Sequence, residues 1–233
     1  MRQYAGGRAP HEDRPWVMLN MVTSVDGAVS VEGRSGGLAG DADREVFHAL
    51  RTFPDVILVG SGTVRAEGYG PPRASPADSA MREAHDAWPV ARIAIVTGSA
   101  SLDYGSALFS EPTSRPLLVT TANAPADRIA QAAEVADVAV AGEDSVDVSR
   151  ALSALGELGA RVVLCEGGPN LNGQLLAADV VDELCLTVSP LLVAGSGKRI
   201  VTGDALETPF GLELVHVLED DGSLFLRYRR PAD

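Results

Sequence analysis

The segment VVLCEGGPNLNG, residues 162–173, places an acidic residue and two glycines directly behind a short apolar run. Gly167 and Gly168 would let the backbone approach a ligand closely, and Pro169 is well placed to begin a helix over residues 169–177. The N-terminus of such a helix presents unpaired N–H groups and a partial positive charge, which favours a phosphate. The same residues also suit a tight turn that needs only glycine geometry, so the local pattern leaves both possibilities open.

A second glycine-rich turn, VILVGSGTVRAEG at residues 56–68, is another candidate for phosphate binding. Gly60 and Gly62 follow an apolar run, as in the dinucleotide fingerprint. Arg65 stands where that fingerprint requires its third glycine, so the full motif fails.

A third candidate, GSGKR at residues 195–199, suggests a P-loop. Leu192 stands where the motif has its first glycine, and Arg199 stands where Ser or Thr would hold magnesium. We therefore exclude a nucleoside triphosphate site, and a basic rim on a hairpin is the alternative.

Near the N-terminus, MVTSVDGAVS at residues 21–30 ends an apolar run in Ser24, Asp26 and Gly27, which is a turn signal by composition. The glycine-rich loop GRSGGLAG at residues 33–40 follows closely. Glycine-lined loops at strand ends are where α/β sheets hold ligands. Asp26 is therefore either a reactive acid or a residue that forms the turn.

Alternating strands and helices must position these turns. Apolar runs rich in β-branched residues predict strands, several of them continuous enough to be covered on both faces, at 16–22, 56–59, 92–96, 117–120, 138–140, 162–165, 184–188, 212–218 and 224–228. Helical patterns lie between them at 41–52, 125–133, 147–158 and 169–177, with a short helix at 77–87 inside a long surface loop over 68–90.

This order predicts an α/β fold, a sandwich with helices on both faces of a mixed, mainly parallel sheet. No helical pattern follows residue 182, and residues 212–229 form two strands around Asp220-Asp221-Gly222. Because Asp-Gly is a strong hairpin signal, we expect antiparallel strands at the C-terminal edge.

Charge and composition exclude several classes of partner. The 233 residues carry 32 acidic against 19 basic side chains, for a formal net charge of −13, and 45% are hydrophobic. This field repels nucleic acid and anionic membrane surfaces, so we expect a small-molecule ligand in an enclosed site. The sequence has no secretory signal pattern and no apolar stretch long enough to span a membrane, which predicts a cytoplasmic protein.

The cysteines and histidines predict no metal site. Cys165 and Cys185 stand in apolar runs without metal-ligand spacing, and the four histidines are scattered. We expect both cysteines to be buried reduced thiols.

Three segments, taken in order, resemble the pyrimidine reductase family of riboflavin biosynthesis: LNMVTSVDGAVS, HALRTFPDVILVGSGTVRAEG and VVLCEGGPNLNGQLL. The resemblance covers residues 14–229. This family is the C-terminal reductase half of bifunctional deaminase-reductases and is similar in fold to dihydrofolate reductase. The resemblance implies a homodimeric three-layer α/β/α reductase. From the chain length we expect one domain over residues 1–233, with a flexible N-terminal segment at 1–13. It also implies hydride transfer from NADPH to C1′ of the ribosyl group of 5-amino-6-(5-phosphoribosylamino)uracil.

The resemblance also assigns site residues. Positions that match substrate contacts are Ser35, Arg51, Arg73 and Glu166, with Glu166 on the pyrimidine and the others on the phosphoribosyl part. Positions that match cofactor contacts are Thr23, Gly37, Thr63, Glu67, Gly167, Gly168, Pro169, Asn170, Leu171, Asn172 and Gly173, the loop ending at Gln174. One turn would then hold both reactants, which supplies the proximity that hydride transfer needs.

The reaction also needs a proton donor near the sugar, for which we name Glu166 with Asp26 as catalytic candidates. The substrate phosphate would be bound by Arg51 together with Arg73, or by Arg34, because an arginine side chain can bind phosphate oxygens in a bidentate manner.

The sequence departs from the family on the substrate side. Asn20 replaces a lysine found in many relatives, Gly37 replaces a tryptophan found in some, and VRAEGYGPPR replaces the usual leucine-alanine-aspartate sequence. No zinc-deaminase signature is present, so we expect deamination on another polypeptide. Two alternatives therefore stand beside the riboflavin reductase: an NADPH reductase of dihydrofolate or another pteridine, and a non-catalytic nucleotide-binding protein.

Overall fold

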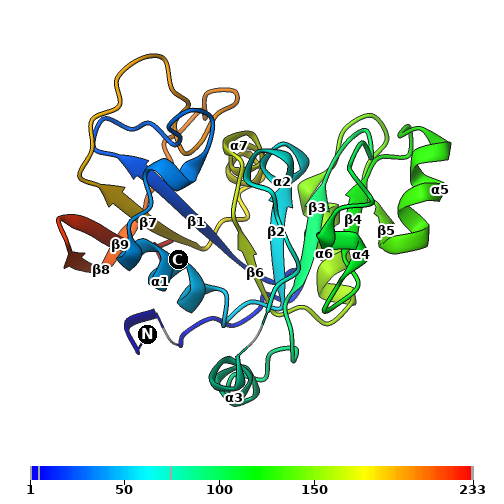
Figure 1. Ribbon diagram of the computed structural model, residues 1–233, viewed down its shortest axis with the longest axis horizontal. Coiled ribbons are helices and arrows are strands. Elements are labelled where there is room, and N and C mark those ends of the chain that lie inside the picture. Colours follow the sequence, from blue (N-terminus) through cyan, green and yellow to red (C-terminus); the bar gives the residue numbers. More distant parts are fainter. Residues whose placement is uncertain (1, 5, 74, 232–233) are drawn as a thin grey trace.

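The computed structural model describes residues 2–4, 6–73 and 75–231 (Figure 1). Within these residues the strands form one nine-stranded sheet in the order β5-β4-β3-β2-β6-β1-β7-β9-β8. The strands are β1 (Trp16–Ser24), β2 (Val56–Gly60), β3 (Arg92–Val96), β4 (Leu117–Thr120), β5 (Asp137–Val140), β6 (Val162–Cys165), β7 (Glu183–Ser189), β8 (Glu213–Asp220) and β9 (Ser223–Arg229). Each apolar run that predicts a strand is confirmed.

The helices cover both faces of the sheet (Figure 1). They are α1 (Asp41–Leu50), α2 (Ser61–Glu67), α3 (Pro76–Ala84), α4 (Ala107–Ser110), α5 (Ala126–Val135), α6 (Val148–Glu157) and α7 (Pro169–Ala177), with 3₁₀ turns at Arg2–Tyr4 and Ser35–Gly37. The predicted α/β/α sandwich is confirmed. The sequence patterns did not predict α2 and α4, which are short.

Strand β2 shows why both faces need helices. Its central residues are at most 1% exposed, so neither side of the strand meets solvent. Val56 and Leu58 pack in the core cluster with α6 and α7, whereas Ile57 and Val59 pack in the cluster with α4 and α5. Successive side chains of a strand point to opposite faces, which is why a continuous apolar run, rather than an alternating one, encodes β2.

The sheet is parallel from β5 through to β7, and β9 and β8 add antiparallel to that edge. Asp221 and Gly222, which join β8 to β9, both have positive φ values, 49° and 73°. Two positive φ values define the tight hairpin turn that suits the twist of antiparallel strands, so the predicted hairpin is confirmed.

The N-terminal segment, which the sequence predicts to be flexible, packs against this C-terminal part of the sheet. Tyr4 is 3% exposed and stacks edge-on against His216, and the Arg8 guanidinium donates to the buried carboxylate of Glu183 at 2.6 Å. Arg227 donates to the same carboxylate at 2.9 Å. These contacts hold Tyr4 and Arg8 against the sheet; positions 1 and 5 lie outside the described residues.

The predicted surface loop 68–90, described except at position 74, contains α3 and is anchored by a buried arginine. Arg82 is 2% exposed and donates to the backbone carbonyls of Trp88, Thr52 and Pro54. Thr52 and Pro54 lie between α1 and β2, so the guanidinium satisfies buried carbonyls of that connection. Burial lowers the pKa of Arg82.

Candidate active site

The carboxyl ends of the parallel strands open into a cavity of about 1620 Å³. It is lined by the end of β1, the loop that follows it, one face of α1, the starts of α2 and α7, and residues 196–198 between β7 and β8. Ligands of open α/β sheets bind at this end of the strands, where loops diverge. We call this cavity the cleft.

The turn from β6 into α7 forms part of the cleft wall. The backbone N–H of Glu166 still pairs with Leu58 of β2, at 3.0 Å, so this residue is held at the strand end. Gly167 has φ of 86° and accepts from the N–H of Gly60 at 2.7 Å, and the Gly167–Gly168 peptide bond is cis. This path requires glycine at position 167, because a positive φ is strained for other residues.

Gly168 allows α7 to lie close to α2. A Cβ built on Gly168 would lie 2.8 Å from the Thr63 Oγ1, a distance that would force one of them to move. Gly168 is the N-cap of α7 and no side chain caps the helix there, while Pro169 at the first turn has no N–H to lose. The first amides of α7 therefore remain available to an anion in the cleft.

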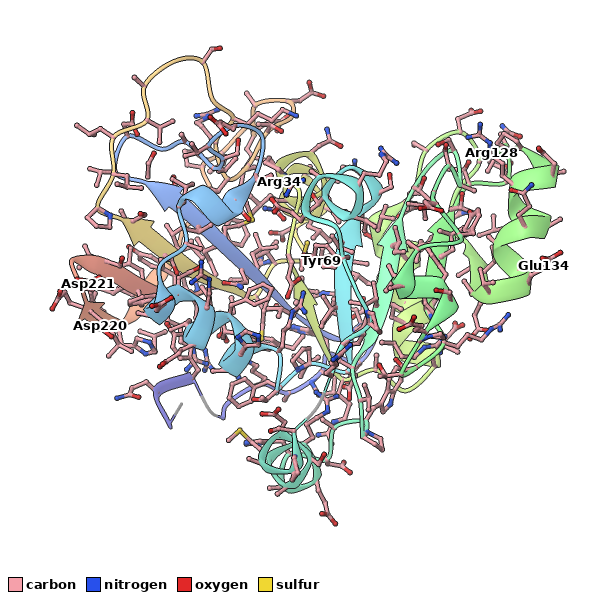
Figure 2. All side chains as sticks on the ribbon, viewed as in Figure 1. Arg34, Tyr69, Arg128, Glu134, Asp220 and Asp221 are labelled. Atoms are coloured by element: carbon pink, nitrogen blue, oxygen red, sulfur yellow. The ribbon has the colours of Figure 1, made fainter. Side chains whose placement is uncertain are left out.

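The side chain of Glu166 is held by Arg51 and Tyr69. Arg51 donates from Nε to Oε1 and from Nη2 to Oε2, both at 2.7 Å, and the Tyr69 hydroxyl donates to Oε2 at 2.6 Å. Tyr69 lies near the middle of the molecule in Figure 2. All three residues line the cleft, so these contacts form one hydrogen-bonded group at its wall.

Burial and charge shift the pKa values in this group. Burial acts to lower the pKa of Arg51, but the adjacent Glu166 carboxylate outweighs it and the pKa is raised. Burial first, and then the Glu166 charge, raise the pKa of Tyr69 well above its usual value. Arg51 therefore stays charged and Tyr69 stays a neutral hydrogen-bond donor at neutral pH.

Helix α1 presents three cleft-lining side chains spaced four residues apart: Asp43, Phe47 and the C-cap residue Arg51. The Arg51 guanidinium lies 4.3 Å from the centre of the Phe47 ring and 5.5 Å from that of Tyr69. Burial raises the pKa of Asp43, against a hydrogen bond from Thr187. The i, i+4, i+8 spacing places these residues on one helix face and is the sequence signal that could have found Asp43 and Phe47.

Several residues named from the sequence lie together in the cleft. Ser35 and Glu67 meet directly, since the Ser35 N–H donates to the Glu67 Oε1 at 2.8 Å and so ties the loop before α1 to the end of α2. The others that line the cleft are Arg51, Thr63, Glu166, Gly168, Pro169, Asn170 and Leu171, together with Gln174.

The structure does not bring Asp26 to the cleft. Its carboxylate accepts from the Ser24 hydroxyl at 2.5 Å and from the Ala194 N–H at 2.7 Å, with further bonds from Val193. The Ser24 hydrogen bond, followed by the backbone bonds, lowers the pKa of Asp26 to about 2. These contacts suit the turn-forming role and leave a reactive acid at position 26 without geometric support.

Five other residues named as cofactor contacts do not line the cleft. The Thr23 hydroxyl donates to backbone carbonyls of its own turn, and Gly37 packs on Val31, which a Cβ would approach to 2.8 Å. Asn172 is fully buried and donates to the Ile200 carbonyl at 2.8 Å. Gly173 faces the carbonyl of Thr202, and Gly167 faces Met21.

Arg73 lies at a separate, smaller cavity of about 230 Å³. Arg51 lines both this cavity and the cleft, and His48, Arg82 and Asp78 also line the smaller one. Arg51 therefore joins the two spaces.

Two further lining residues, Tyr69 and Lys198, are not predicted from the sequence, for different reasons. Tyr69 belongs to the long loop after α2, where no periodicity predicts which side chains turn inward. Lys198 belongs to GSGKR, which was set aside as a P-loop, and its place in the cleft depends on how residues 190–203 cross the molecule. The spacing of residues in the sequence therefore does not predict that Tyr69 or Lys198 lines the cleft.

The cysteines are free and buried, as expected, and burial raises the pKa of Cys165 to about 12. Over the described ranges, no helix is both long and apolar enough to span a membrane, and no cluster of three or more His, Cys, Asp or Glu side chains has metal-site geometry.

The fold and this cleft can be compared with known proteins. The model of the RibD C-terminal domain matches residues 15–226. The chain belongs to the RibD C-terminal domain family. Two relatives named 2,5-diamino-6-ribosylamino-4(3H)-pyrimidinone 5′-phosphate reductase support this. One, from Archaeoglobus fulgidus, is 27% identical over 93% of this chain and 100% of its own. The other, from Methanothermobacter thermautotrophicus, is 30% identical over 83% and 87%.

Solved structures of this family agree with the fold. A pyrimidine reductase-like protein from Corynebacterium diphtheriae superposes with a TM-score of 0.85 at 25% identity, covering 95% of this chain and 94% of its own. The yeast riboflavin biosynthesis reductase Rib7 superposes with a TM-score of 0.70 at 23% identity, over 96% and 93%, and supports the fold alone. The dihydrofolate reductase-like architecture expected from the sequence is therefore confirmed.

Proposed function

We propose that this protein is the NADPH-dependent reductase that converts the ribosyl group of a 6-ribosylaminopyrimidine 5′-phosphate to a ribityl group in riboflavin biosynthesis. The relatives of the family carry the name of this reductase. The observation that carries the proposal is the turn at residues 166–169, where a fixed carboxylate and the open N-terminus of α7 face the same cleft.

The residues present suit a dinucleotide. A side chain at Gly168 would clash with Thr63. A Cβ built on Gly60 would lie 3.5 Å from the backbone nitrogen of Gly168, so the two glycine turns pack closely together. Backbone amides of α7 and the Thr63 hydroxyl would hold the pyrophosphate, with Asn170 beside them. When bound, the reduced nicotinamide supplies the hydride. The protein supplies the positions of the two reactants and a partly enclosed space.

Glu166 is the residue we propose to contact the pyrimidine. A carboxylate offers about four lone-pair positions, and Arg51 and Tyr69 occupy three of them. The remaining position, on Oε1, can accept one N–H from the substrate ring. Because Arg51 fixes the carboxylate on two sides, this acceptor is already oriented before the ring arrives.

Two forms of the ring fit this acceptor, and the relatives favour one of them. The resemblance in the sequence points to 5-amino-6-(5-phosphoribosylamino)uracil, whereas the Archaeoglobus fulgidus relative is named for the 2,5-diamino pyrimidinone. Both carry a ring N–H that a carboxylate can accept. The two substrates differ at one exocyclic position, an amino group or an oxygen, so comparing them tests what the wall beside Glu166 selects.

The substrate phosphate would lie at the smaller cavity. Arg51 and Arg73 both line this space, and Arg73 makes no ion pair with any described residue. An arginine guanidinium matches phosphate oxygens in a bidentate manner, so Arg73 is the cation we propose for this group. Ser35, which lines the cleft, would contact the sugar part.

A homodimer is proposed from the C-terminal strands. Val217 of β8 lies opposite Leu226 of β9, which lies opposite Leu186 of β7, so the three share one face of the sheet. Val217 is 46% exposed and the neighbouring Leu224 is 40% exposed. β8 is also the edge strand, with unpaired backbone groups along its outer side. A second copy of this chain would cover the apolar face and the open edge of β8.

The two free thiols agree with the expected cytoplasmic location.

The test is to follow the loss of NADPH absorbance with each ring form and, separately, with dihydrofolate. The proposal predicts turnover of a phosphoribosylaminopyrimidine and none of dihydrofolate. Turnover of dihydrofolate alone would instead support the pteridine alternative. NADPH binding without oxidation by any of the three would support a non-catalytic nucleotide-binding protein.

A further inference from the structure

Lys198 is the only lysine in the sequence, where the other 18 of the 19 basic Lys and Arg side chains are arginines. It lies in the long connection between β7 and β8 and lines the cleft. In Figure 1 this connection, drawn in orange, lies beside the blue loop that follows β1. The one lysine side chain of the protein is thus placed at the cavity that we propose as the active site.

The backbone on either side of Lys198 is anchored. On one side the Lys198 carbonyl accepts from the N–H of Val29 in the loop after β1, at 3.2 Å. On the other side the Asn172 side chain donates to the Ile200 carbonyl at 2.8 Å, and the Thr202 N–H donates to the Pro169 carbonyl at 3.0 Å. Residues 198–202 therefore pass from the loop after β1 to the first turn of α7.

The charges of the cleft leave one cation uncommitted. Its lining carboxylates are Asp43, Glu67, Asp144, Asp147 and Glu166, and its lining cations are Arg51 and Lys198. Arg51 is committed to Glu166 through two hydrogen bonds. Lys198 is the lining cation that has no ion pair with the described part of the chain. An anionic ligand entering this acidic cleft would meet Lys198 as its available positive charge.

We propose that the Lys198 ammonium binds a phosphate group of the dinucleotide whose pyrophosphate lies at the N-terminus of α7. This inference rests on the proposed function. Lysine binds phosphate as a mobile point charge, and the helix amides bind it through fixed N–H groups, so the two are complementary. The dinucleotide is favoured over the substrate phosphate because residues 200–202 pack on α7, whereas Arg73 lines the separate cavity beyond Arg51.

A single lysine permits a direct spectroscopic test. Reductive methylation with ¹³C-formaldehyde labels Lys198 and the N-terminal amine and keeps the lysine charge, so the lysine signal reports on one site. The proposal predicts that this signal shifts as NADP⁺ is added, with saturation at the Kd found by calorimetry, and that ribose 5-phosphate does not shift it. Saturation of calorimetric binding with no change in the lysine signal would overturn the proposal.

Binding by variants separates the sources of phosphate. Lys198→Met should raise the Kd for NADPH about 10- to 100-fold, the range for loss of a charged hydrogen bond, and Lys198→Arg should restore most of the affinity. Arg161→Met is the matched control, since it removes one positive charge directly before β6, at the end of the strand opposite the cleft, where Arg161 pairs with Asp86. An equal loss for NADPH and NADH assigns Lys198 to the pyrophosphate, and a loss confined to NADPH assigns it to the 2′-phosphate.

The outcomes that count against the assignment are of two kinds. Unchanged NADPH affinity in Lys198→Met, or a change only in the KM of the phosphorylated substrate, contradicts the role of Lys198 and leaves the proposed function intact. If the wild-type protein itself binds neither NADPH nor NADH, the proposed function fails, and this inference fails with it.

Discussion

Arg51 and Glu166 form a two-point ion pair at the wall of the cleft, Nε to Oε1 and Nη2 to Oε2, both at 2.7 Å. Arg51 is the C-cap of α1 and Glu166 directly follows β6, and 115 positions separate them in the chain. The pair therefore fixes a helix to the sheet and also orients the carboxylate proposed for the substrate. Its side chains are only 23% and 3% exposed, so it is far less screened than a surface ion pair.

Glu166→Gln should weaken this link. The amide can accept one hydrogen bond from Arg51 but carries no charge, so a partly buried guanidinium loses its counter-ion. We expect the free energy of unfolding to fall by about 1–3 kcal/mol, measured by urea denaturation at neutral pH. Glu134→Gln on α5 is a control of the same substitution at a residue that does not line the cleft and lies well apart from Tyr69 in Figure 2. Equal stability of the two variants would mean that the ion pair contributes nothing.

Tyr69→Phe should remove one hydrogen bond to Glu166 and keep the ring beside Arg51. The expected loss in the free energy of unfolding is about 1 kcal/mol. Since the pKa of Tyr69 is well above its usual value, the folded protein loses stability as pH rises past the usual tyrosine range and only the unfolded chain ionises. The stability difference between wild type and Tyr69→Phe should therefore shrink or reverse in alkali. A difference that is independent of pH would contradict this account.

Asp43→Asn should stabilise the protein at neutral pH. Burial raises the pKa of Asp43, so its contribution to stability is present below the pKa of the unfolded chain and is lost as pH rises through the folded pKa. Asparagine has no such loss and can still accept from Thr187. Chemical denaturation across acid and neutral pH should show a gain for the variant that disappears in acid. A variant less stable than wild type at neutral pH would show that the Asp43 charge is favourable.

The sequence predicts the sheet well because its signal is local. Each central parallel strand is buried on both faces, so its apolar run is continuous, and the hairpin at Asp221-Gly222 needs the φ values that these residues adopt. Helix α2 was missed because its residues, Ser61–Glu67, begin in the glycine turn and hold one buried apolar side chain, Val64. A helix with so little apolar periodicity gives no pattern to detect.

The site is predicted in part, for a similar reason. The turn at Glu166 and Gly168 is contiguous in sequence, so its residue types reveal its geometry. Tyr69 and Lys198 reach the cleft through long connections whose paths depend on tertiary contacts. Asp26 shows the opposite difficulty, because a carboxylate in a turn can serve the turn itself, and here its partners are Ser24 and the N–H groups of the loop that crosses it.

Val217→Asp should prevent the proposed dimer. The substitution places a charge on the exposed apolar face of β8 and β9, where a second copy would have to desolvate it. Light scattering after size exclusion should give a dimer for wild type and a monomer for the variant. Val140→Asp on β5, an exposed position at the opposite edge of the sheet, should remain dimeric. A monomeric wild-type protein would contradict the dimer.

The turn between β6 and α7 is proposed to hold the dinucleotide through its backbone and the pyrimidine through Glu166, and calorimetry on two variants tests this most directly. Gly168→Ala brings a Cβ to 2.8 Å from the Thr63 Oγ1, so overpacking at this turn should weaken NADPH binding at least 10-fold. Adding Thr63→Ala should recover part of the lost affinity. Glu166→Gln should keep NADPH affinity and lose about 10- to 100-fold in kcat/KM for the pyrimidine. NADPH binding to Gly168→Ala as tight as to wild type, or equal effects of both variants on cofactor and substrate, would contradict the account.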